Sequence, residues 1–499
     1  MAEPFAELIN HLREVHDLKG ALSLLHWDQE TQLPSGATAG RARQIGALAA
    51  VVHQRETEPR FLELVDALAA QLDQLEFGQQ VDVRETKWRI DRKRRLDTAL
   101  VRERATLRSE AHAVWVNARS NNDFTALRPY LDRLIAIERR VAAAIDSGRP
   151  AYDVLLEGFE PGASSALLAQ VFNTLRDGLL PLIARLNQRC ERRPVDGRGL
   201  CGAFGLSAQR RFNRMVAERI GFDFARGRLD ESAHPFTTEV GDDVRITTRL
   251  SKSDLRYGLF STLHEVGHAL YEQGLDATAR GTPRATACSM GMHESQSRLW
   301  ENLVGRSEAF WRWLLPLAVQ AFPELRPRRP RAVLLAANEA RPSLIRTEAD
   351  ELTYNLHIIL RFELEQALIA GELAAADLPA AWEEKMRHFL GVTPASDRDG
   401  VLQDVHWAEG LFGYFPTYAL GNLYAAQLYE AAQRDFGRLE EGFAAGDFGT
   451  LRTWLGERVQ RHGQSWRAPE LVRRVTGSAP EARPLLAHLT RKLEWLEAN

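Results

Sequence analysis

Two histidines and a glutamate in the segment 263–270 are of the residue types that metal-dependent hydrolases use. His264 and His268 stand four residues apart, and Glu265 follows the first of them, giving His264-Glu265-x-x-His268. On an α-helix this spacing places both imidazoles on one face, where their nitrogens can hold one metal ion. Glu265 then projects beside them and can take a proton from a water molecule on the metal. Two ordinary core histidines are the alternative interpretation of the same pattern.

The residues around this motif favour the metal-binding interpretation. Ser251, with Asp254 three residues later, is typical of a helix start, and apolar residues then recur at helical spacing up to about Gln273, before Gly274. Just upstream, the β-branched segments 234–240 and 244–250 are joined by Gly241-Asp242-Asp243, which predicts a β-hairpin. In zinc peptidases a strand in this place often borders the cleft and pairs with extended substrate.

Two histidines leave a catalytic zinc one protein ligand short, and a carboxylate on a following helix is the usual third. Glu294 is the best candidate, because it lies 26 residues after His268 at the start of a helix that can pack against the first. Glu301 and Glu272 are weaker alternatives, and Glu294 could instead be a surface acid. Three protein ligands would leave the fourth position open for water.

Hydrolysis of a carbonyl compound also needs donors for the developing oxyanion. His406, Tyr414 and Tyr418 lie in a segment rich in glycine and aromatic residues that is suited to supply them. Acidic residues that could accept the second N–H of a ligand imidazole are also present, although each could equally be a cap or a surface acid. These are Asp243, Asp350 and Asp404.

The rest of the chain is mostly helical in pattern, with one small sheet near the middle. The charge-dense stretch 84–108 is best explained as a solvated helix or helical hairpin and not as a binding patch. Apolar periodicity predicts helices over several further segments. These are 5–24, 38–145, 163–192 (ending near Arg193-Pro194), 206–222, 343–370 and 421–499.

Size and composition limit the functional classes. A chain of 499 residues should form one large domain with a cleft, or two lobes. The net charge of −3 argues against binding to nucleic acid or to an anionic membrane. Three cysteines without a C-x-x-C favour a reducing cytoplasm over a disulfide framework. We find neither a signal-peptide pattern nor an apolar run long enough to span a membrane.

Several separated motifs together resemble the thermostable (Taq-type) metallocarboxypeptidase family. Besides His264-Glu265-x-x-His268, the similarity includes the tryptophan-containing segment 27–31 and the tail around Trp454 and Gly463, so it covers nearly the whole chain. The other matching motifs are His234-Pro235-Phe236, Asp243-x-Arg245-x-Thr247, His293-Glu294-Ser295-Gln296, Ile345-Arg346-x-x-Ala349-Asp350 and Gly400-x-x-Gln403-Asp404-x-His406-Trp407.

The resemblance implies a mainly α fold: a large two-lobed helical domain with a deep central groove and a small β-sheet beside the zinc-binding helix. It implies a single catalytic domain over 1–499, in which an N-terminal helical part (1–195) covers the groove and 196–499 forms the zinc-binding part. It further implies a homodimer that removes single residues from peptide C-termini, and one zinc ion per chain, for which cobalt could substitute.

The resemblance also implies roles for individual residues. Zinc would be held by His264, His268 and Glu294, with Glu265 as the general base. His406 and Tyr418 would stabilise the tetrahedral intermediate, although Tyr414 is close by.

An exopeptidase must also bind the free α-carboxylate of its substrate, and arginine is the bidentate choice. Arg346 and Arg245 are the candidates, unless they pair with Asp350 or Asp243. His234 and Tyr414 complete the expected substrate-binding set; His234 could line the cleft or bond the hairpin backbone.

We therefore expect a zinc-dependent carboxypeptidase that acts on peptides with a free C-terminus. An endo-acting zinc oligopeptidase would use the same metal chemistry without capturing a terminal carboxylate. A non-catalytic helical scaffold with a structural zinc is the third possibility, but such a site needs no base like Glu265.

Overall fold

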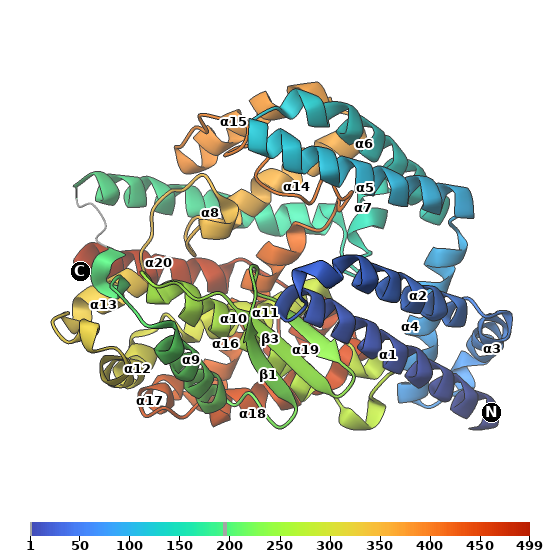
Figure 1. Cartoon of the computed structure of the whole chain (residues 1–499), viewed down its shortest axis with the longest axis horizontal. Coiled ribbons are helices and arrows are strands. Elements are labelled where there is room, and N and C mark those ends of the chain that lie inside the picture. Colours follow the sequence, from blue (N-terminus) through green and yellow to red (C-terminus); the bar gives the residue numbers. More distant parts are fainter. Residues whose placement is uncertain (1, 193–196) are drawn as a thin grey trace.

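The N-terminal helices form one wall of the molecule, drawn in blue in Figure 1. The structure, a computed structural model, describes residues 2–192 and 197–499. A small apolar cluster, including Leu8, Phe61, Val65 and Val83, joins the first, third and fourth helices. The helices of this wall are α1 (Ala2–Thr31), α2 (Thr38–Glu56), α3 (Pro59–Ala69) and α4 (Phe77–Arg94).

A second group of helices forms the upper layer and the middle of the molecule (Figure 1). Asp97 and Asp123 begin two of these helices by accepting hydrogen bonds from the backbone N–H groups of Leu100 and Ala126. The helices of this group are α5 (Thr98–Asn121), α6 (Phe124–Asp146), α7 (Ala151–Leu156) and α8 (Ser165–Arg192). The predicted end of the helix over 163–192 is confirmed at Arg192, while residues 193–194 and the predicted boundary at 195 lie outside the described residues.

The small sheet stands beside the metal-motif helix, as predicted. The hairpin of β2 (Thr237–Val240) and β3 (Asp243–Thr248) is confirmed as an antiparallel pair. A third strand that the sequence analysis did not predict, β1 (Gly227–Glu231), pairs with β3 in parallel, so the order is β1-β3-β2. The helix α9 (Leu206–Ile220) precedes it and ends at Gly221, whose φ of 117° requires glycine.

The motif helix, α10 (Leu255–Gly274), runs through the centre of the molecule. Asp254 caps its N-terminus by accepting a hydrogen bond from the backbone N–H of Arg256. The helix therefore begins directly after Asp254, one of the two residues from which its start was predicted. Helix α11 (Met290–Arg298) packs against it and continues as a π-helical turn over Leu299–Val304. The predicted pair of packed helices is therefore present.

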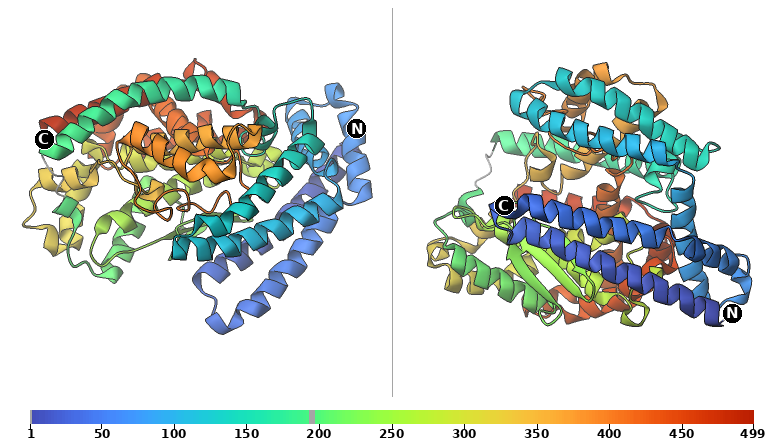
Figure 2. Two further views of the ribbon diagram at one scale, coloured as in Figure 1. Left: turned by 90° about the horizontal axis from the view of Figure 1, so that it is seen from above. Right: turned by 45° about the vertical axis from the view of Figure 1, so that its right-hand side comes forward.

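The remaining helices enclose α10 and α11. They are α12 (Glu308–Ala321), α13 (Pro330–Ala337), α14 (Tyr354–Ala370), α15 (Leu378–Leu390), α16 (Pro416–Phe436), α17 (Leu439–Ala444), α18 (Gly449–Arg458), α19 (Ala468–Thr476) and α20 (Arg483–Ala498). One continuous apolar core runs from Leu100 to Leu496 and includes buried faces of α10, α11, α14 and α16. Figure 2 shows the N-terminal helices standing at one side of this body. The mainly α fold with one small sheet is confirmed.

The predicted helix over 343–370 begins later than its sequence pattern indicated. Helix α14 starts only at Tyr354, and a short 3₁₀ turn covers Arg346–Glu348. The Asp350 carboxylate accepts from the backbone N–H groups of Leu352 and Thr353, which fixes a turn there. A local bond between side chain and backbone therefore overrides the helical pattern of this segment.

No helix in the described part of the chain combines the length and the apolar character that crossing a bilayer requires.

Candidate metal centre

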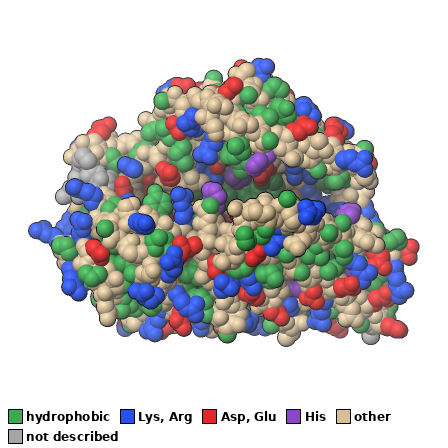
Figure 3. Space-filling model, in the orientation of Figure 1, with side chains coloured by type: hydrophobic (Ala, Val, Ile, Leu, Met, Phe, Trp, Pro, Cys, Tyr) green, Lys and Arg blue, Asp and Glu red, His purple; other side chains and the backbone are tan. Residues whose placement is uncertain are grey.

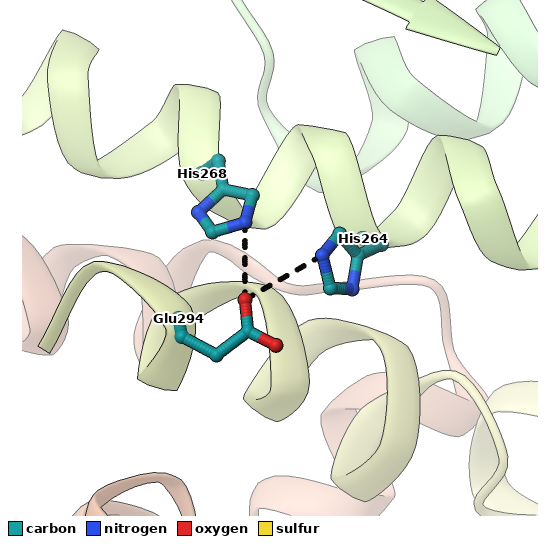
Figure 4. A group of neighbouring side chains, drawn as sticks. All are labelled: His264, His268 and Glu294. Atoms are coloured by element: carbon teal, nitrogen blue, oxygen red, sulfur yellow. Dashed lines mark ion pairs between the residues drawn. The ribbon is translucent and has the colours of Figure 1, made fainter. Parts of the chain in front are cut away.

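Two histidines of α10 and one glutamate of α11 converge on one point. His264 and His268 lie a turn apart and direct their Nε2 atoms at the same Oε2 of Glu294, at 3.6 and 3.3 Å (Figure 4). Tetrahedral zinc with bonds of about 2.0–2.1 Å would hold neighbouring donor atoms about 3.4 Å apart. The three donors therefore match such an ion in type and spacing.

The other ring nitrogen of each histidine is occupied by a hydrogen bond. His264 Nδ1 lies 2.9 Å from Glu301 Oε2, and His268 Nδ1 lies 2.5 Å from Nδ1 of His293. His293 in turn contacts Glu272 Oε1 through Nε2, at 2.8 Å. Each donor and acceptor in this series of hydrogen bonds has a partner when His264 and His268 both carry their proton on Nδ1. Their Nε2 lone pairs then face Glu294.

Buried charges favour the metal-binding forms of Glu294 and His268, whereas burial lowers the pKa of His264 less than Glu294 and Glu301 raise it. Burial pushes the pKa of Glu294 upward, but Arg298 and the two histidines lower it well below the usual range. Arg298 Nε donates to the second carboxylate oxygen of Glu294 at 2.7 Å. Burial lowers the pKa of His268 to about 3. A charged carboxylate and a neutral imidazole are the forms that a metal ion requires.

Glycines allow the supporting helices to approach closely enough. A side chain at Gly267 of α10 would place its Cβ 2.5 Å from the backbone oxygen of Gln296 in α11. A side chain at Gly421 of α16 would place its Cβ 2.5 Å from Cγ of Glu294. Real Cβ atoms do not approach neighbours this closely, so both positions require glycine for the third ligand to reach the histidines.

Glu265 lies between the ligand helix and the sheet. Its Oε2 accepts from the Thr237 hydroxyl of β2 at 2.6 Å, and the same hydroxyl lies 3.1 Å from its backbone oxygen. Burial raises the pKa of Glu265, while His264 and Thr237 oppose that rise. A carboxylate that is held in place and has a raised pKa is suited to accept a proton.

The three candidate metal ligands open into a cavity of about 570 Å³. It is lined by His264, Glu265, His268 and Glu294, with Pro235 to Thr237 from the hairpin side and Tyr414 and Tyr418 from the opposite side. On the face shown in Figure 3, the surface is hollowed between the upper helical layer and the lower part, and histidine side chains gather there. This hollow accords with the predicted groove.

The structure brings the three predicted oxyanion residues together. Nε2 of His406 lies 3.4 Å from the Tyr418 hydroxyl, and the rings of Tyr414 and Tyr418 are 5.4 Å apart. Both tyrosines line the cavity, whereas His406 stands behind them, against Phe415. Burial lowers the pKa of His406 to about 4, so its imidazole is neutral at pH 7.

The predicted carboxylate-binding arginines are both engaged in ion pairs. Arg346 is buried and donates to Asp404 at 2.7 Å, while its Nη1 donates to the Tyr354 hydroxyl at 3.2 Å. The pairing acid is therefore Asp404 and not the expected Asp350. The Arg346 guanidinium lies 4.9 Å from the ring of Tyr418, directly behind the cavity wall.

Arg245 stands outside the cavity lining. It pairs with Asp243 at 2.7 Å and stacks 4.3 Å over the ring of Trp27 in α1. His234 is exposed, and its carbonyl accepts from the Ser232 hydroxyl at 2.6 Å. The structure therefore places these two predicted substrate-binding residues at the hairpin and not with the metal ligands.

The acids proposed as partners of the ligand imidazoles have other contacts. Asp350 caps its own turn, Asp243 pairs with Arg245, and Asp404 pairs with Arg346 and Arg361. Glu301 and the pair of His293 with Glu272 occupy those positions instead. Glu301 and Glu272 were the predicted alternatives for the third ligand. Glu301 contacts His264 directly, and Glu272 contacts His293, which is the partner of His268.

The sequence analysis missed Thr237, Arg298 and the role of His293. Thr237 lies 28 residues before Glu265, and only the fold brings the two together. Arg298 lies one helical turn after Glu294, so the i, i+4 spacing of unlike charges could have identified that pair.

Comparison with known proteins places the chain in a family. The family profile described as "Carboxypeptidase Taq (M32) metallopeptidase" matches residues 7–493. The chain is 45% identical to thermostable carboxypeptidase 1 of Thermus thermophilus, over 98% of both chains. It is 36% identical to carboxypeptidase 1 of Bacillus subtilis, over 97% of both.

Solved structures agree with the sequence relatives. The crystal structure of the M32 carboxypeptidase from Deinococcus radiodurans superposes with a TM-score of 0.96 at 40% identity, covering all of both chains. Metallocarboxypeptidase 1 of Trypanosoma cruzi gives a TM-score of 0.95 at 33% identity, over 99% of this chain and 100% of the other. The chain therefore belongs to the carboxypeptidase Taq (M32) family of metallopeptidases and is a metallocarboxypeptidase.

Proposed function

We propose that this enzyme uses one zinc ion per chain to release single amino acids from the free C-terminus of peptides. The observation that carries the proposal is the convergence of His264, His268 and Glu294 on one point, with Glu265 beside them at the cavity wall. A zinc ion held there would polarise the substrate carbonyl and lower the pKa of a water molecule. Cobalt accepts the same donor types and could replace zinc.

Glu265 is the general base in this proposal. Its carboxylate takes the proton of the attacking water and then delivers it to the nitrogen of the departing residue. The Thr237 hydroxyl holds the carboxylate by donating to one oxygen, which leaves the other free for the proton. His293 and Glu301 keep the ligand imidazoles oriented while this transfer takes place.

Tyr418 and His406 would stabilise the oxyanion that forms on the substrate. The Tyr418 hydroxyl is the donor that lines the cavity, and neutral His406 contacts it from behind. Tyr414 stands next to it and would contact the substrate. Donors fixed before reaction act without a reorganisation cost, so their contribution to catalysis can be large.

We propose that Arg346 binds the α-carboxylate of the substrate. Its Nε and Nη2 are bound to Asp404, but Nη1 contacts only the neutral hydroxyl of Tyr354. The Arg346 guanidinium lies 4.9 Å from the ring of Tyr418, a residue of the cavity wall. We retain Arg245 and His234 as residues that act through the hairpin at the cavity edge and not by direct contact with the terminal residue.

The cellular setting and the assembly are also proposals. The three cysteines, Cys190, Cys201 and Cys288, are all free thiols, which supports a reducing cytoplasm. We propose a homodimer, and we propose that residues 1–195 cover the groove of a catalytic part over 196–499, both on the strength of the family resemblance. Light scattering of the purified protein tests the dimer.

Metal removal and product mapping test the proposed reaction. Treating the purified protein with a chelator should abolish release of amino acids, and one equivalent of zinc should restore it. Mass spectrometry of an unmodified peptide should show a ladder of products that shorten by one residue from the C-terminus. Full activity after complete metal removal, or internal cleavage as the main event, would overturn the proposal.

A further inference from the structure

Two cavities meet at helix α4. The metal cavity of about 570 Å³ adjoins a second cavity of about 1080 Å³, which is bordered by the N-terminal helices. Trp88, Arg89 and Gly158 line both, so they mark the passage between them. Six lysine and arginine side chains line the larger cavity, against two glutamates, Glu56 and Glu239. Five of these six cations, all except Arg89, pair with carboxylates among the described residues, so the passage leads from the candidate metal site into a chamber whose charges are largely balanced.

Arg89 is distinguished from the other cations of α4 by its contacts. Its Nη2 donates to Oε1 of Gln464 at 2.6 Å, and Gln464 is anchored by donating to the Ala287 carbonyl at 3.0 Å. Within the described parts of the chain, no carboxylate lies within ion-pair distance of the Arg89 guanidinium. By contrast, acidic side chains pair with Arg92, Lys93 and Arg94.

The surroundings of Arg89 make its lack of a carboxylate partner costly. Burial lowers the pKa of Arg89, so the cation has lost much of its hydration. A half-buried guanidinium with one neutral partner leaves donors available for an anion. The neighbouring Trp88 is flanked by the guanidinium groups of Arg92 and Arg467, at 5.3 and 5.1 Å from its ring. The site is therefore prepared for a carboxylate that arrives with a ligand.

The proposed reaction indicates which part of the substrate reaches Arg89. An enzyme that removes one residue at a time holds one residue beyond the cut bond and the whole remaining peptide before it. The remaining peptide needs the larger space, and the larger cavity lies beyond Arg89. Residues upstream of the cut bond should therefore pass this arginine on their way into the larger cavity.

We propose that Arg89 binds an acidic side chain upstream of the cut bond, so that the enzyme favours peptides carrying glutamate or aspartate a few residues before the C-terminus. This inference rests on the proposed function and names a substrate class for it. Gln464 orients the guanidinium, and the bidentate geometry of arginine suits a carboxylate. The Arg89 contact selects substrates and takes no part in the chemical step.

Matched peptides test the proposal on the zinc-loaded enzyme. Each pair shares one sequence and one C-terminal residue and differs by glutamate or glutamine at the second, third, fourth or fifth position from the end. One charge-assisted hydrogen bond predicts a kcat/KM about tenfold higher for the glutamate peptide at one of these positions. Arg89→Gln should reduce this ratio to about 1 and leave the glutamine peptide within about threefold of the wild type.

Lys87→Gln is the matched control. Lys87 lies on the same helix, pairs with Asp66 and Asp91, and is absent from both cavity linings. The control should keep the glutamate preference of the wild type. Arg89→Lys, which retains the charge without the bidentate fork, should keep part of it. Zinc content and circular dichroism should match the wild type in all three variants.

The possible outcomes separate this inference from the proposed function. No glutamate preference in the wild type at any tested position, or a preference that persists in Arg89→Gln, overturns the inference while release of amino acids continues. An equal loss for both peptides in Arg89→Gln would instead assign Arg89 to the terminal carboxylate and also overturn it. Absence of released amino acids from every peptide would contradict the proposed function itself.

Discussion

The metal centre and the N-terminal wall border the same groove, but different forces hold them. Helices α10 and α11 lie in the main apolar core, and two half-buried acids support the histidines: Glu301 contacts the outer nitrogen of His264, and Glu272 contacts His293, the partner of His268. The N-terminal helices share a small core of their own. Ion pairs, such as Asp82 with Arg284 and Glu85 with Arg467, connect them to the body.

This difference assigns distinct functions to the two regions. Close packing around the ligands holds the reacting groups in one geometry, which metal chemistry requires. Substitution of the ion pairs between the wall and the body changes the core little, so the wall can differ in the peptides that it accepts. Substitutions at the metal centre should therefore change the reaction or the metal, whereas those in the wall should change stability and the choice of peptide.

The largest effect is expected at the base. Glu265→Gln keeps the shape of the side chain but cannot accept a proton, so kcat should fall by about a thousandfold. The variant should still bind one metal ion, because the ligand atoms are untouched. Steady-state kinetics and metal analysis of the same sample measure both quantities. Glu308→Gln, at a surface acid paired with Arg312, is the control and should behave as the wild type.

The two tyrosines should differ. Tyr418→Phe removes the hydroxyl that contacts His406 and should lower kcat by about a hundredfold, as expected for one oxyanion donor. Tyr414→Phe should act mainly on KM, since Tyr414 is assigned to substrate binding. Comparison of kcat and KM for both variants decides the assignment. A larger loss of kcat in Tyr414→Phe would exchange the two roles.

Metal affinity should respond to the acid behind His264. Glu301→Gln weakens the acceptor of the His264 N–H and should reduce zinc affinity by about 10–100-fold. Competition with a chromogenic chelator measures this change. Glu272→Gln acts on His268 only through His293 and should have the smaller effect. Unchanged zinc affinity in Glu301→Gln would show that the packing of α10 alone orients this ligand.

The wall should show the smallest effect on the reaction. Arg284→Gln leaves the buried Asp82 carboxylate without its cation and should lower the free energy of unfolding by about 1–3 kcal/mol. The kcat on a peptide with an uncharged upstream part should stay within about twofold, since no reacting group moves. Denaturant unfolding and kinetics of the same preparation provide the measurements.

The pH dependence of Arg284→Gln follows from Asp82. Burial raises the pKa of Asp82, and Arg284 opposes that rise. Because the Asp82 pKa is higher in the folded than in the unfolded state, the folded protein holds this proton more tightly. The stability that Asp82 contributes is therefore fully present below the ordinary aspartate pKa and is lost as pH rises through the folded-state pKa. Removing Arg284 enlarges this loss, so the variant should approach wild-type stability at acidic pH. A destabilisation independent of pH would contradict the assigned role of the pair.

The sequence allowed prediction of the parts of the site that depend on local spacing. The i, i+4 histidines, the adjacent Glu265 and the hairpin before them could be identified because helical and strand periodicity act over few residues. Glu294 could be placed on a second helix because a catalytic metal needs a third ligand. The mainly α class followed from the same periodicity over the whole chain.

Contacts between distant segments could not be predicted in this way. Pairing of Arg346 with Asp404, 58 residues away, depended on tertiary geometry, whereas pairing of Arg245 with Asp243 was one of the alternatives taken from the sequence. The late start of α14 has a local origin instead, since Asp350 fixes a turn where apolar periodicity alone favours helix. That Arg89 has a neutral partner and no carboxylate partner among the described residues can be recognised only from the contacts of the folded chain.

A free peptide and its C-terminally amidated twin test the central claim most directly. The zinc-loaded enzyme is incubated with each, and the products are identified by mass spectrometry over time. We expect stepwise loss of single residues from the free peptide and at least a hundredfold slower cleavage of the amide, because a charged, bidentate contact is lost. Cleavage of the same bond at equal rates in both peptides would contradict a carboxypeptidase that reads the substrate terminus.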